Sequence, residues 1–325
     1  MADGHLRWGI LGAAKIAREF TCPGIHQSRR GSVAVVASRD VARAEALAEA
    51  YGARAVASYD ALLADPLVDA VYIPLPNDAH VPWTLTSLEA GKHVLCEKPI
   101  ALAADEIDAL IAARDASGRL AAEAFMVTHH PQWIRARELV RGGAIGRLCH
   151  VQGAFSFFND DPANIRNQAA LGGGALRDIG VYPCVVTRFV TGAEPTAVTA
   201  QIDWDAGIDA TARVSAEFPE FGLDFYVSMR MADRQLMTFH GDAGWLSVHA
   251  GFNAGVYGDE VLELRDADGR VTLERYPANQ YALQADAFAA SALDGAEFAC
   301  PLEFSQGNQR MIDMIYAAAG GTPDT

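Results

Sequence analysis

The pattern of apolar and polar positions divides the chain into two parts of different texture. In the first 125 residues, short apolar runs alternate with segments of helical periodicity. The runs expected as strands are 6–11, 33–38, 69–76, 93–97 and 120–126, and the expected helices are 15–27, 39–52, 79–92 and 102–118. Strands and helices alternating at this spacing predict a parallel, doubly wound sheet covered on both faces.

After about residue 145, strand-like segments follow one another with few helices between them. They are 148–158, 195–204, 210–218, 223–231, 235–241, 244–250, 260–266 and 270–276. Helical patterns cover 175–190, 282–295 and 305–319. Successive strands separated by turn residues predict an α+β domain with a large, mostly antiparallel sheet that is open on one face. We therefore expect two domains, 1–125 and 126–325, with helix 305–319 packing back on the first.

Composition narrows the classes of function. The chain has 325 residues, a formal net charge of −15 and a pI near 4.9. This charge disfavours nucleic acid and anionic membranes as partners, since both require a basic surface. No apolar run is long enough to span a bilayer, and the N-terminus lacks a signal-peptide pattern. Five cysteines without CxxC spacing indicate a reduced, cytoplasmic protein, and the adjacent His129 and His130 do not suggest a metal site.

A glycine-containing turn follows the first expected strand. Gly12, Ala14 and Ala17 occupy the positions of a dinucleotide fingerprint, and Ala13, Lys15 and Ile16 complete the turn. Only the first glycine of the usual pattern is present, so a turn of small residues needed for packing alone is the alternative. The position between strand and helix favours a phosphate-binding turn.

The end of the second strand predicts which cofactor binds. Ser38, Arg39 and Arg43 stand where NAD-binding proteins carry an acidic residue. A hydroxyl and two guanidinium groups suit a 2′-phosphate, and we expect Asp40 to cap the following helix. The alternative is that both arginines are solvated helix residues. The pattern favours NADP over NAD.

Two later strand ends carry polar groups toward the same crevice. The segment 74–80 supplies Leu75, Pro76, Asn77 and His80, and the segment 96–99 supplies Glu97 and Lys98. Ligands of doubly wound sheets bind outside the carboxyl ends of the strands.

Lysine is rare in this chain. There are three, Lys15, Lys92 and Lys98, so a lysine between glutamate and proline at this edge is a candidate for chemistry. A solvated loop charge is the alternative. We also expect a cis Lys98–Pro99 bond.

The segment 171–183, LGGGALRDIGVYP, leads three glycines into a helix. Asp178 and Tyr182 are four residues apart and therefore share one helix face, and Gly180 permits close backbone approach. A tyrosine beside an ammonium group is a plausible general acid/base, because the positive charge stabilises the phenolate. The alternative is a half-buried tyrosine with a capping aspartate. Arg166, just before the glycines, is placed to reach cofactor or substrate.

These motifs in this order resemble the glucose–fructose oxidoreductase / inositol dehydrogenase (Gfo/Idh/MocA) family. The resemblance covers nearly the whole chain and implies a Rossmann domain followed by an open-faced sheet domain that forms a homodimer or homotetramer. It also implies that Lys98, Asp178 and Tyr182 line the site, with Tyr182 as proton donor or acceptor. Tyrosine at that position, the GxAxxA turn and Ser38-Arg39 are similar to the aldose and dihydrodiol dehydrogenase branch. Thr128 replaces an arginine common in the family, which leaves the substrate open.

The sequence thus predicts an NADP(H)-dependent oxidoreductase acting on a sugar, such as xylose or glucose, or on a related polyol or diol. Lys98 would lower the tyrosine pKa, Asp178 would orient the substrate, and Phe158 and Tyr281 would be pocket walls. The alternatives are a sugar–sugar oxidoreductase or glycoside-cleaving hydrolase that retains its cofactor, and a non-catalytic NADP sensor.

Overall fold

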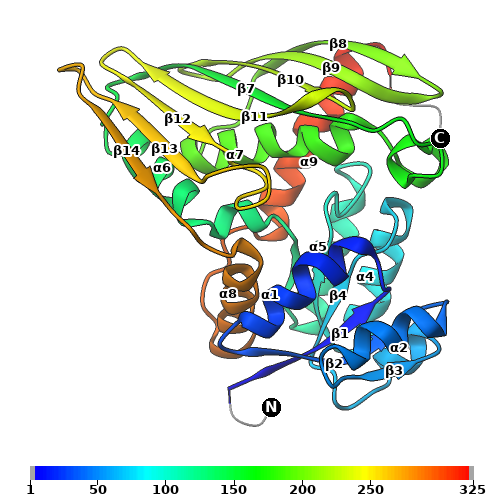
Figure 1. Cartoon of the computed structure of the whole chain (residues 1–325). Helices are drawn as coiled ribbons and strands as arrows, with labels where there is room; N and C mark the ends of the chain where they lie inside the picture. The colour runs from blue at the N-terminus through cyan, green and yellow to red at the C-terminus, as the bar shows by residue number, and fades with distance from the viewer. Residues whose placement is uncertain (1–3, 322–325) are drawn as a thin grey trace. The chain divides into compact units, whose positions relative to one another are not determined.

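The chain forms two compact units that are described separately. A computed structural model describes residues 4–321, and Figure 1 shows its helices and strands. Unit 1 comprises the residues up to 129 together with 279–306, and unit 2 comprises 130–278 and the residues from 307 onward.

Unit 1 is built on a six-stranded parallel sheet. Its strands are β1 (Leu6–Leu11), β2 (Gly31–Ala37), β3 (Arg54–Val56), β4 (Ala70–Ile73), β5 (His93–Cys96) and β6 (Ala121–Glu123). They lie in the order β3-β2-β1-β4-β5-β6, and every neighbouring pair is parallel. This is the Rossmann strand order, with its topological switch point between β1 and β4. The predicted fold class of the first domain is confirmed, although the three-residue β3 was not foreseen.

Helices cover both faces of this sheet. They are α1 (Cys22–Gln27), α2 (Val41–Glu49), α3 (Tyr59–Leu63), α4 (His80–Glu89), α5 (Glu106–Ser117) and α8 (Gln280–Asp294). Alternate residues of β1 face opposite layers, as the strand period requires. Trp8 packs on Phe288 of α8 at a ring distance of 4.9 Å. On the other side, a Cβ at Gly9 would lie 2.6 Å from Leu62 of α3. The close approach of α3 therefore requires glycine.

The compact units differ from the expected domains in where the C-terminal helices belong. Helix α8, placed in the second domain by its position in the sequence, belongs to unit 1, where Phe20 packs on Tyr281 at 5.4 Å. Helix α9 (Leu302–Ala318) is divided between the units, with the change after Gln306. Gln306 donates to Asp108 of α5 at 2.6 Å. It is thus the start of α9, and not all of 305–319, that belongs with unit 1. The hydrophobic pattern shows that a helix is amphipathic but not which sheet it covers.

Unit 2 contains an eight-stranded sheet. Its strands are β7 (Leu148–Phe158), β8 (Ala197–Asp205), β9 (Ile208–Glu217), β10 (Gly222–Ser228), β11 (Arg230–Gly241), β12 (Trp245–His249), β13 (Val261–Arg265) and β14 (Val271–Arg275). Their order is β14-β13-β12-β11-β7-β10-β9-β8. All pairs are antiparallel except β7 with β10. The predicted mostly antiparallel sheet is confirmed.

The two faces of this sheet differ. Helices α6 (Pro131–Arg141), which the sequence analysis missed, and α7 (Val181–Thr191) lie against one face (Figure 1). The other face carries a groove of about 910 Å³, and its polar lining includes Gln152, Gln201, Arg213, Asp224, Tyr226 and Arg234. Within residues 4–321, no helix combines the length and apolar character needed to cross a bilayer.

Candidate functional site

The carboxyl ends of four neighbouring strands form one edge of the unit 1 sheet. Gly12 follows β1, Ser38 follows β2, Leu75 lies two residues beyond β4, and Glu97 and Lys98 follow β5. Because these strands are parallel and adjacent, the predicted cofactor residues of unit 1 meet at one edge, where doubly wound sheets bind their ligands.

The turn after β1 is built of small residues. Gly12 has a φ of +116°, its N–H donates to the Ala37 carbonyl at 2.7 Å, and a Cβ there would lie 3.1 Å from the Leu75 side chain. Another residue would therefore strain the backbone and crowd the turn. Ala13 is buried, and the helical segment starts at Lys15, whose exposed ammonium lies 3.7 Å from Glu19. A turn of small residues leading into a helix fits a pyrophosphate.

The residues directly after β2 combine a hydroxyl, two guanidinium groups and one acid. Asp40 caps α2 as predicted, because its side chain accepts from the Arg43 N–H at 3.3 Å. Its carboxylate also pairs with the Arg43 Nε at 3.3 Å, so the acid is engaged locally. Ser38 is buried and its Oγ accepts from the Asp40 N–H at 3.2 Å, whereas Arg39 is exposed.

Tyr59 is a neighbour of this site that sequence reasoning missed. Its hydroxyl lies 3.8 Å from the position a Gly12 Cβ would take, and its ring meets Trp83 edge-on at 4.9 Å. Burial raises the pKa of Tyr59, and the nearby Arg39 charge opposes the rise. Tyr59 begins the five-residue α3, with two residues between it and the short β3, so no periodic pattern indicated it.

His80 braces two loops of this edge. It is fully buried, and its ring nitrogens lie 2.7 Å from the Pro99 carbonyl oxygen and 2.9 Å from the Leu75 carbonyl oxygen. Burial lowers its pKa. This geometry gives His80 a structural role between the loops after β4 and β5, and its predicted contact with cofactor stays a prediction. Pro76 and Asn77, also predicted, are half-buried on the loop that His80 braces.

The segment around Lys98 is held from several sides. The Lys98–Pro99 bond is cis, as predicted. Glu97 accepts from the Tyr72 hydroxyl at 2.5 Å, and Tyr72 in turn accepts from Thr21 at 2.9 Å. Lys98 is half-buried at the strand end.

The other two lysines have structural or surface positions. Lys92 donates to the backbone carbonyls of Asp65 and Val68 at 3.0 and 2.8 Å, and Lys15 is exposed. Of the two lysines at this edge of the sheet, Lys15 is exposed and Lys98 is half-buried.

Glu123, the last residue of β6, is a buried acid behind this segment. Only 3% of it is exposed, and its Oε1 accepts from the Ile100 N–H at 2.9 Å. Burial raises the pKa of Glu123 to about 7, and the charge of Lys98 opposes the rise. The hydrogen bond fixes the chain directly after Pro99.

In unit 2, the glycine run permits a close-packed helix start. Cβ atoms at Gly173 and Gly174 would collide with the Arg166 carbonyl and the Asp209 carboxylate, respectively. Asp209 is fully buried and accepts from the Leu176 N–H at 2.5 Å and from the Tyr316 hydroxyl at 2.8 Å. A buried carboxylate thus holds the beginning of the helix on which Asp178 and Tyr182 lie.

Asp178 lies on a π-helical turn, η6 (Leu176–Gly180), that runs directly into α7. A second π turn, η1 (Ala17–Thr21), precedes Pro23 in the same way that η6 precedes Pro183. Proline lacks an N–H and clashes with the carbonyl four residues earlier, and a wider turn accommodates it. Pro23 therefore does not end its helical segment.

Arg166 pairs with Asp178 on this turn, and Tyr182 follows on α7. Arg166 Nε donates to Asp178 Oδ2 at 2.6 Å. Tyr182 is 5% exposed, and its ring packs on Phe155 at 5.5 Å and on Phe252 at 5.4 Å. The aromatic neighbours fix the phenol ring.

The two predicted pocket walls lie in different units. Phe158 is 62% exposed at the end of β7, whereas Tyr281 belongs to α8 in unit 1. Their contact with substrate stays a prediction. Among residues 4–321, no group of three His, Cys, Asp or Glu side chains has the geometry to hold a metal ion.

Two family models match the chain. Residues 6–125 match an oxidoreductase family with an NAD-binding Rossmann fold, Gfo/Idh/MocA, and residues 133–247 match the C-terminal domain of the same family. The chain belongs to the Gfo/Idh/MocA oxidoreductase family. The resemblance found in the motifs is thereby confirmed.

Curated relatives within this family align over nearly the whole chain. An uncharacterized oxidoreductase of Rhizobium meliloti is 40% identical, with 97% of each chain covered. A D-xylose 1-dehydrogenase (NADP(+)) of Haloferax volcanii is 36% identical, again with 97% of each chain covered.

Solved structures agree with these relatives. An aldose–aldose oxidoreductase from Caulobacter crescentus, complexed with glycerol, superposes with a TM-score of 0.90 at 27% identity and 97% coverage of each chain. A 3-ketoreductase from Actinomadura kijaniata, in complex with NADP and TDP-benzene, gives a TM-score of 0.89 at 30% identity, covering 98% of this chain and 99% of the other.

Proposed function

We propose that this Gfo/Idh/MocA oxidoreductase is an NADP-dependent dehydrogenase or reductase of a sugar or a related polyol or diol. One observation carries the proposal. A single sheet edge presents the Gly12 turn, the Ser38–Arg39 pair and Lys98. The relative named an NADP-dependent xylose dehydrogenase and the NADP-bound ketoreductase support the same cofactor and class of substrate.

The residues at this edge fit the parts of NADP. The Gly12 turn and the start of the following helix would hold the pyrophosphate. Ser38 and Arg39 would bind the 2′-phosphate, with Arg43 partly neutralised by Asp40. The segment from Leu75 to Asn77, with Glu97 and Lys98, would line the nicotinamide end. Bound NADP supplies the acceptor or donor of hydride.

Tyr182 would move the proton of the reaction. In the oxidation direction its phenolate oxygen takes the proton of the substrate hydroxyl, and in reduction the phenol returns it. The ammonium group of Lys98 would stabilise the phenolate and hold the substrate oxygen. Asp178, held by Arg166 at 2.6 Å, would accept a hydrogen bond from a neighbouring substrate hydroxyl. A sugar or diol offers such adjacent hydroxyl groups.

A second candidate is a sugar–sugar oxidoreductase that retains its cofactor. The resemblance to the aldose–aldose oxidoreductase, at a TM-score of 0.90, favours it over a glycoside-cleaving hydrolase. In such an enzyme one sugar reduces the bound cofactor and a second sugar reoxidises it. Cofactor that survives extensive desalting would identify this mode.

Two further features support a cellular location and a state of self-association. All five cysteines, each within the described residues, are free thiols, which supports a reducing, cytoplasmic location. The groove-bearing face of the eight-stranded sheet, on which no described helix packs, supports self-association as a dimer or tetramer. Light scattering of the protein as it elutes from a size-exclusion column tests the oligomeric state.

Replacement of the proposed acid/base tests the mechanism. Tyr182→Phe should lower kcat by about 10²- to 10⁴-fold, the usual contribution of a general acid/base, while the dissociation constant of NADP stays unchanged. Tyr257→Phe is the matched control, because that hydroxyl is exposed and donates to the Asp233 carbonyl at 3.4 Å, away from the proposed site residues. A Tyr182→Phe variant with wild-type kcat would remove Tyr182 from the mechanism.

A further inference from the structure

The segment between β7 and the glycine run, residues 159–171, carries Arg166 but has few apolar anchors. Ile165 is 43% exposed, and the preceding Phe158 is 62% exposed. The segment consists of short 3₁₀ turns with local caps such as that of Asn164 on the Arg166 N–H. Without a buried apolar face, its conformation depends on polar contacts with the rest of unit 2.

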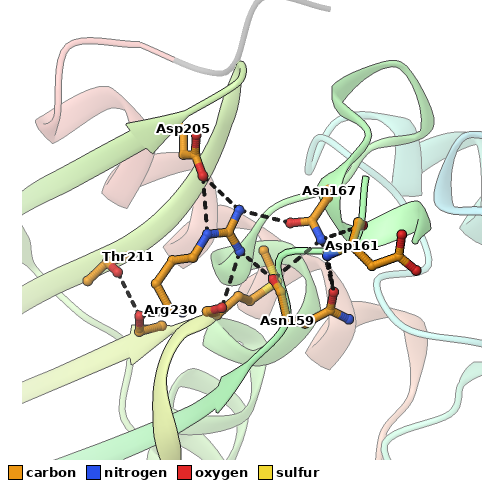
Figure 2. Close-up of polar contacts among 8 residues, drawn as sticks. Asn159, Asp161, Asn167, Asp205, Thr211 and Arg230 are labelled. Atoms are coloured by element: carbon orange, nitrogen blue, oxygen red, sulfur yellow. Dashed lines mark hydrogen bonds and ion pairs between the residues drawn. The ribbon is translucent and has the colours of Figure 1, made fainter. Parts of the chain in front are cut away.

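Arg230 supplies these contacts from the first position of β11. Figure 2 shows its guanidinium between the sheet and the segment. Nε and Nη2 donate to Asp205 Oδ2 of β8 at 3.1 and 2.8 Å, which fixes the guanidinium on the sheet. Nη1 donates to the carbonyls of Asn159 and Met229, and Nη2 also reaches Asn167 Oδ1 at 3.1 Å. Both ends of the segment 159–167 are therefore bound to one side chain.

The contacts of Arg230 with Asp205, Asn159 and Asn167 are called the clamp, and Asn167 extends it within the segment. Its Nδ2 donates to Asn159 Oδ1 at 3.0 Å and to the Asp161 carbonyl at 2.9 Å, while its Oδ1 accepts from Arg230 (Figure 2). This amide therefore uses its donor and acceptor sides on different partners. Arg166, the neighbouring residue, holds Asp178 at 2.6 Å.

We propose that Arg230 is a positioning residue for substrate specificity. It fixes the segment 159–167, so that Arg166 holds Asp178 in the orientation that receives the substrate hydroxyl. This inference rests on the proposed function for the role of Asp178. The clamp itself rests only on the contacts of Arg230.

The chemistry of the clamp requires arginine. The planar guanidinium donates to Asp205 on the sheet and to Asn159 and Asn167 of the segment at the same time. A lysine ammonium is a point donor on a flexible stem. Arg230→Lys keeps the charge and loses the fork. A purely electrostatic role would survive this change, and a positioning role would not.

The test combines kinetics with hydrogen exchange. In Arg230→Lys, the KM for the sugar or diol found with the wild type should rise at least tenfold, while the dissociation constant of NADP, bound by unit 1, should stay within about twofold. Amides of 159–167 should exchange at least tenfold faster. Asn167→Ala, which removes the other side of the clamp, should give the same pattern, and the double variant should add little to either.

Arg135→Lys is the matched control. Arg135 makes a comparable two-pronged pair with Glu274 of β14, at 3.1 and 3.3 Å, and touches no residue of the segment in the contacts described. It should leave the sugar KM and the exchange of 159–167 unchanged. Wild-type KM or wild-type exchange in both folded Arg230→Lys and Asn167→Ala variants would overturn the inference. If the wild type turned over no sugar or diol, the proposed function would be contradicted instead. The exchange measurement alone would then test whether Arg230 fixes the segment 159–167.

Discussion

Asp209 offers a prediction in which stability and pH are linked. Its carboxyl is fully buried beneath the start of the helix that carries Asp178 and Tyr182. Burial raises the pKa of Asp209 to about 6, against the opposing hydrogen bonds from Leu176 and Tyr316. An exposed aspartate in the unfolded chain titrates near 3.8. The folded protein therefore holds this proton more tightly than the unfolded chain does.

The sign and size of the effect follow from this difference. Because the folded-state pKa is the higher one, the stabilisation is fully present below pH 3.8 and is lost as the pH rises through 6. A difference of about two pKa units corresponds to ~3 kcal/mol over the whole range. Between pH 5.5 and 7.5, clear of the pI of 4.9, on the order of 1 kcal/mol of this should be lost.

Urea unfolding at several pH values measures this loss. Asp209→Asn cannot ionise, so the stability of the wild type relative to this variant should fall by about 1 kcal/mol between pH 5.5 and 7.5. Asp233→Asn, on the exposed part of β11, should show no such trend. Tyr316→Phe removes a hydrogen bond that lowers the pKa, and should move the loss to higher pH. A pH-independent difference between the wild type and Asp209→Asn would refute the reasoning.

Three further predictions concern other residues. Arg39→Ala should weaken NADP binding about 10- to 100-fold, the loss of one charged hydrogen bond, and leave NAD binding unchanged by calorimetry. Glu123→Gln keeps an acceptor for the Ile100 N–H. Because burial raises the Glu123 pKa to about 7, the wild type should lose stability as the pH rises from 5 to 7. The variant cannot ionise at this position, so its urea midpoint should not show that loss. Gly174→Ala should lower the thermal midpoint more than Gly207→Ala: both glycines have a positive φ, but a Cβ at Gly174 would collide with Asp209, whereas one at Gly207 would lie 3.6 Å from Ala169.

Local patterns in the sequence were enough to predict most of the fold. The strand 148–158 has the predicted bounds, because a stretch rich in apolar and aromatic residues is a local signal. The missed β3 has only three residues, and α6 begins at Pro131 after a buried 3₁₀ turn. The assignment of α8 to unit 1 depends on contacts such as Trp8 with Phe288, which sequence periodicity does not encode.

The candidate site, like the fold, has residues that local sequence patterns predicted and residues that they missed. Gly12, the Asp40 cap and the cis Lys98–Pro99 bond were predicted, since each follows from chemistry within a few residues. Asp209 and Phe252 were missed, because they reach the helix of Tyr182 from distant parts of the chain. The rarity of lysine was the one compositional signal that led to Lys98 directly.

The central claim is tested most directly by one titration of desalted protein with NADP⁺ and NAD⁺, followed by addition of aldoses, polyols and diols at 340 nm. The account predicts tighter binding of NADP⁺ than of NAD⁺ and absorbance growth with at least one sugar or diol. Equal or tighter binding of NAD⁺ would contradict the role given to Ser38 and Arg39. Binding of neither nucleotide, in protein that carries no retained cofactor, would contradict the account as a whole.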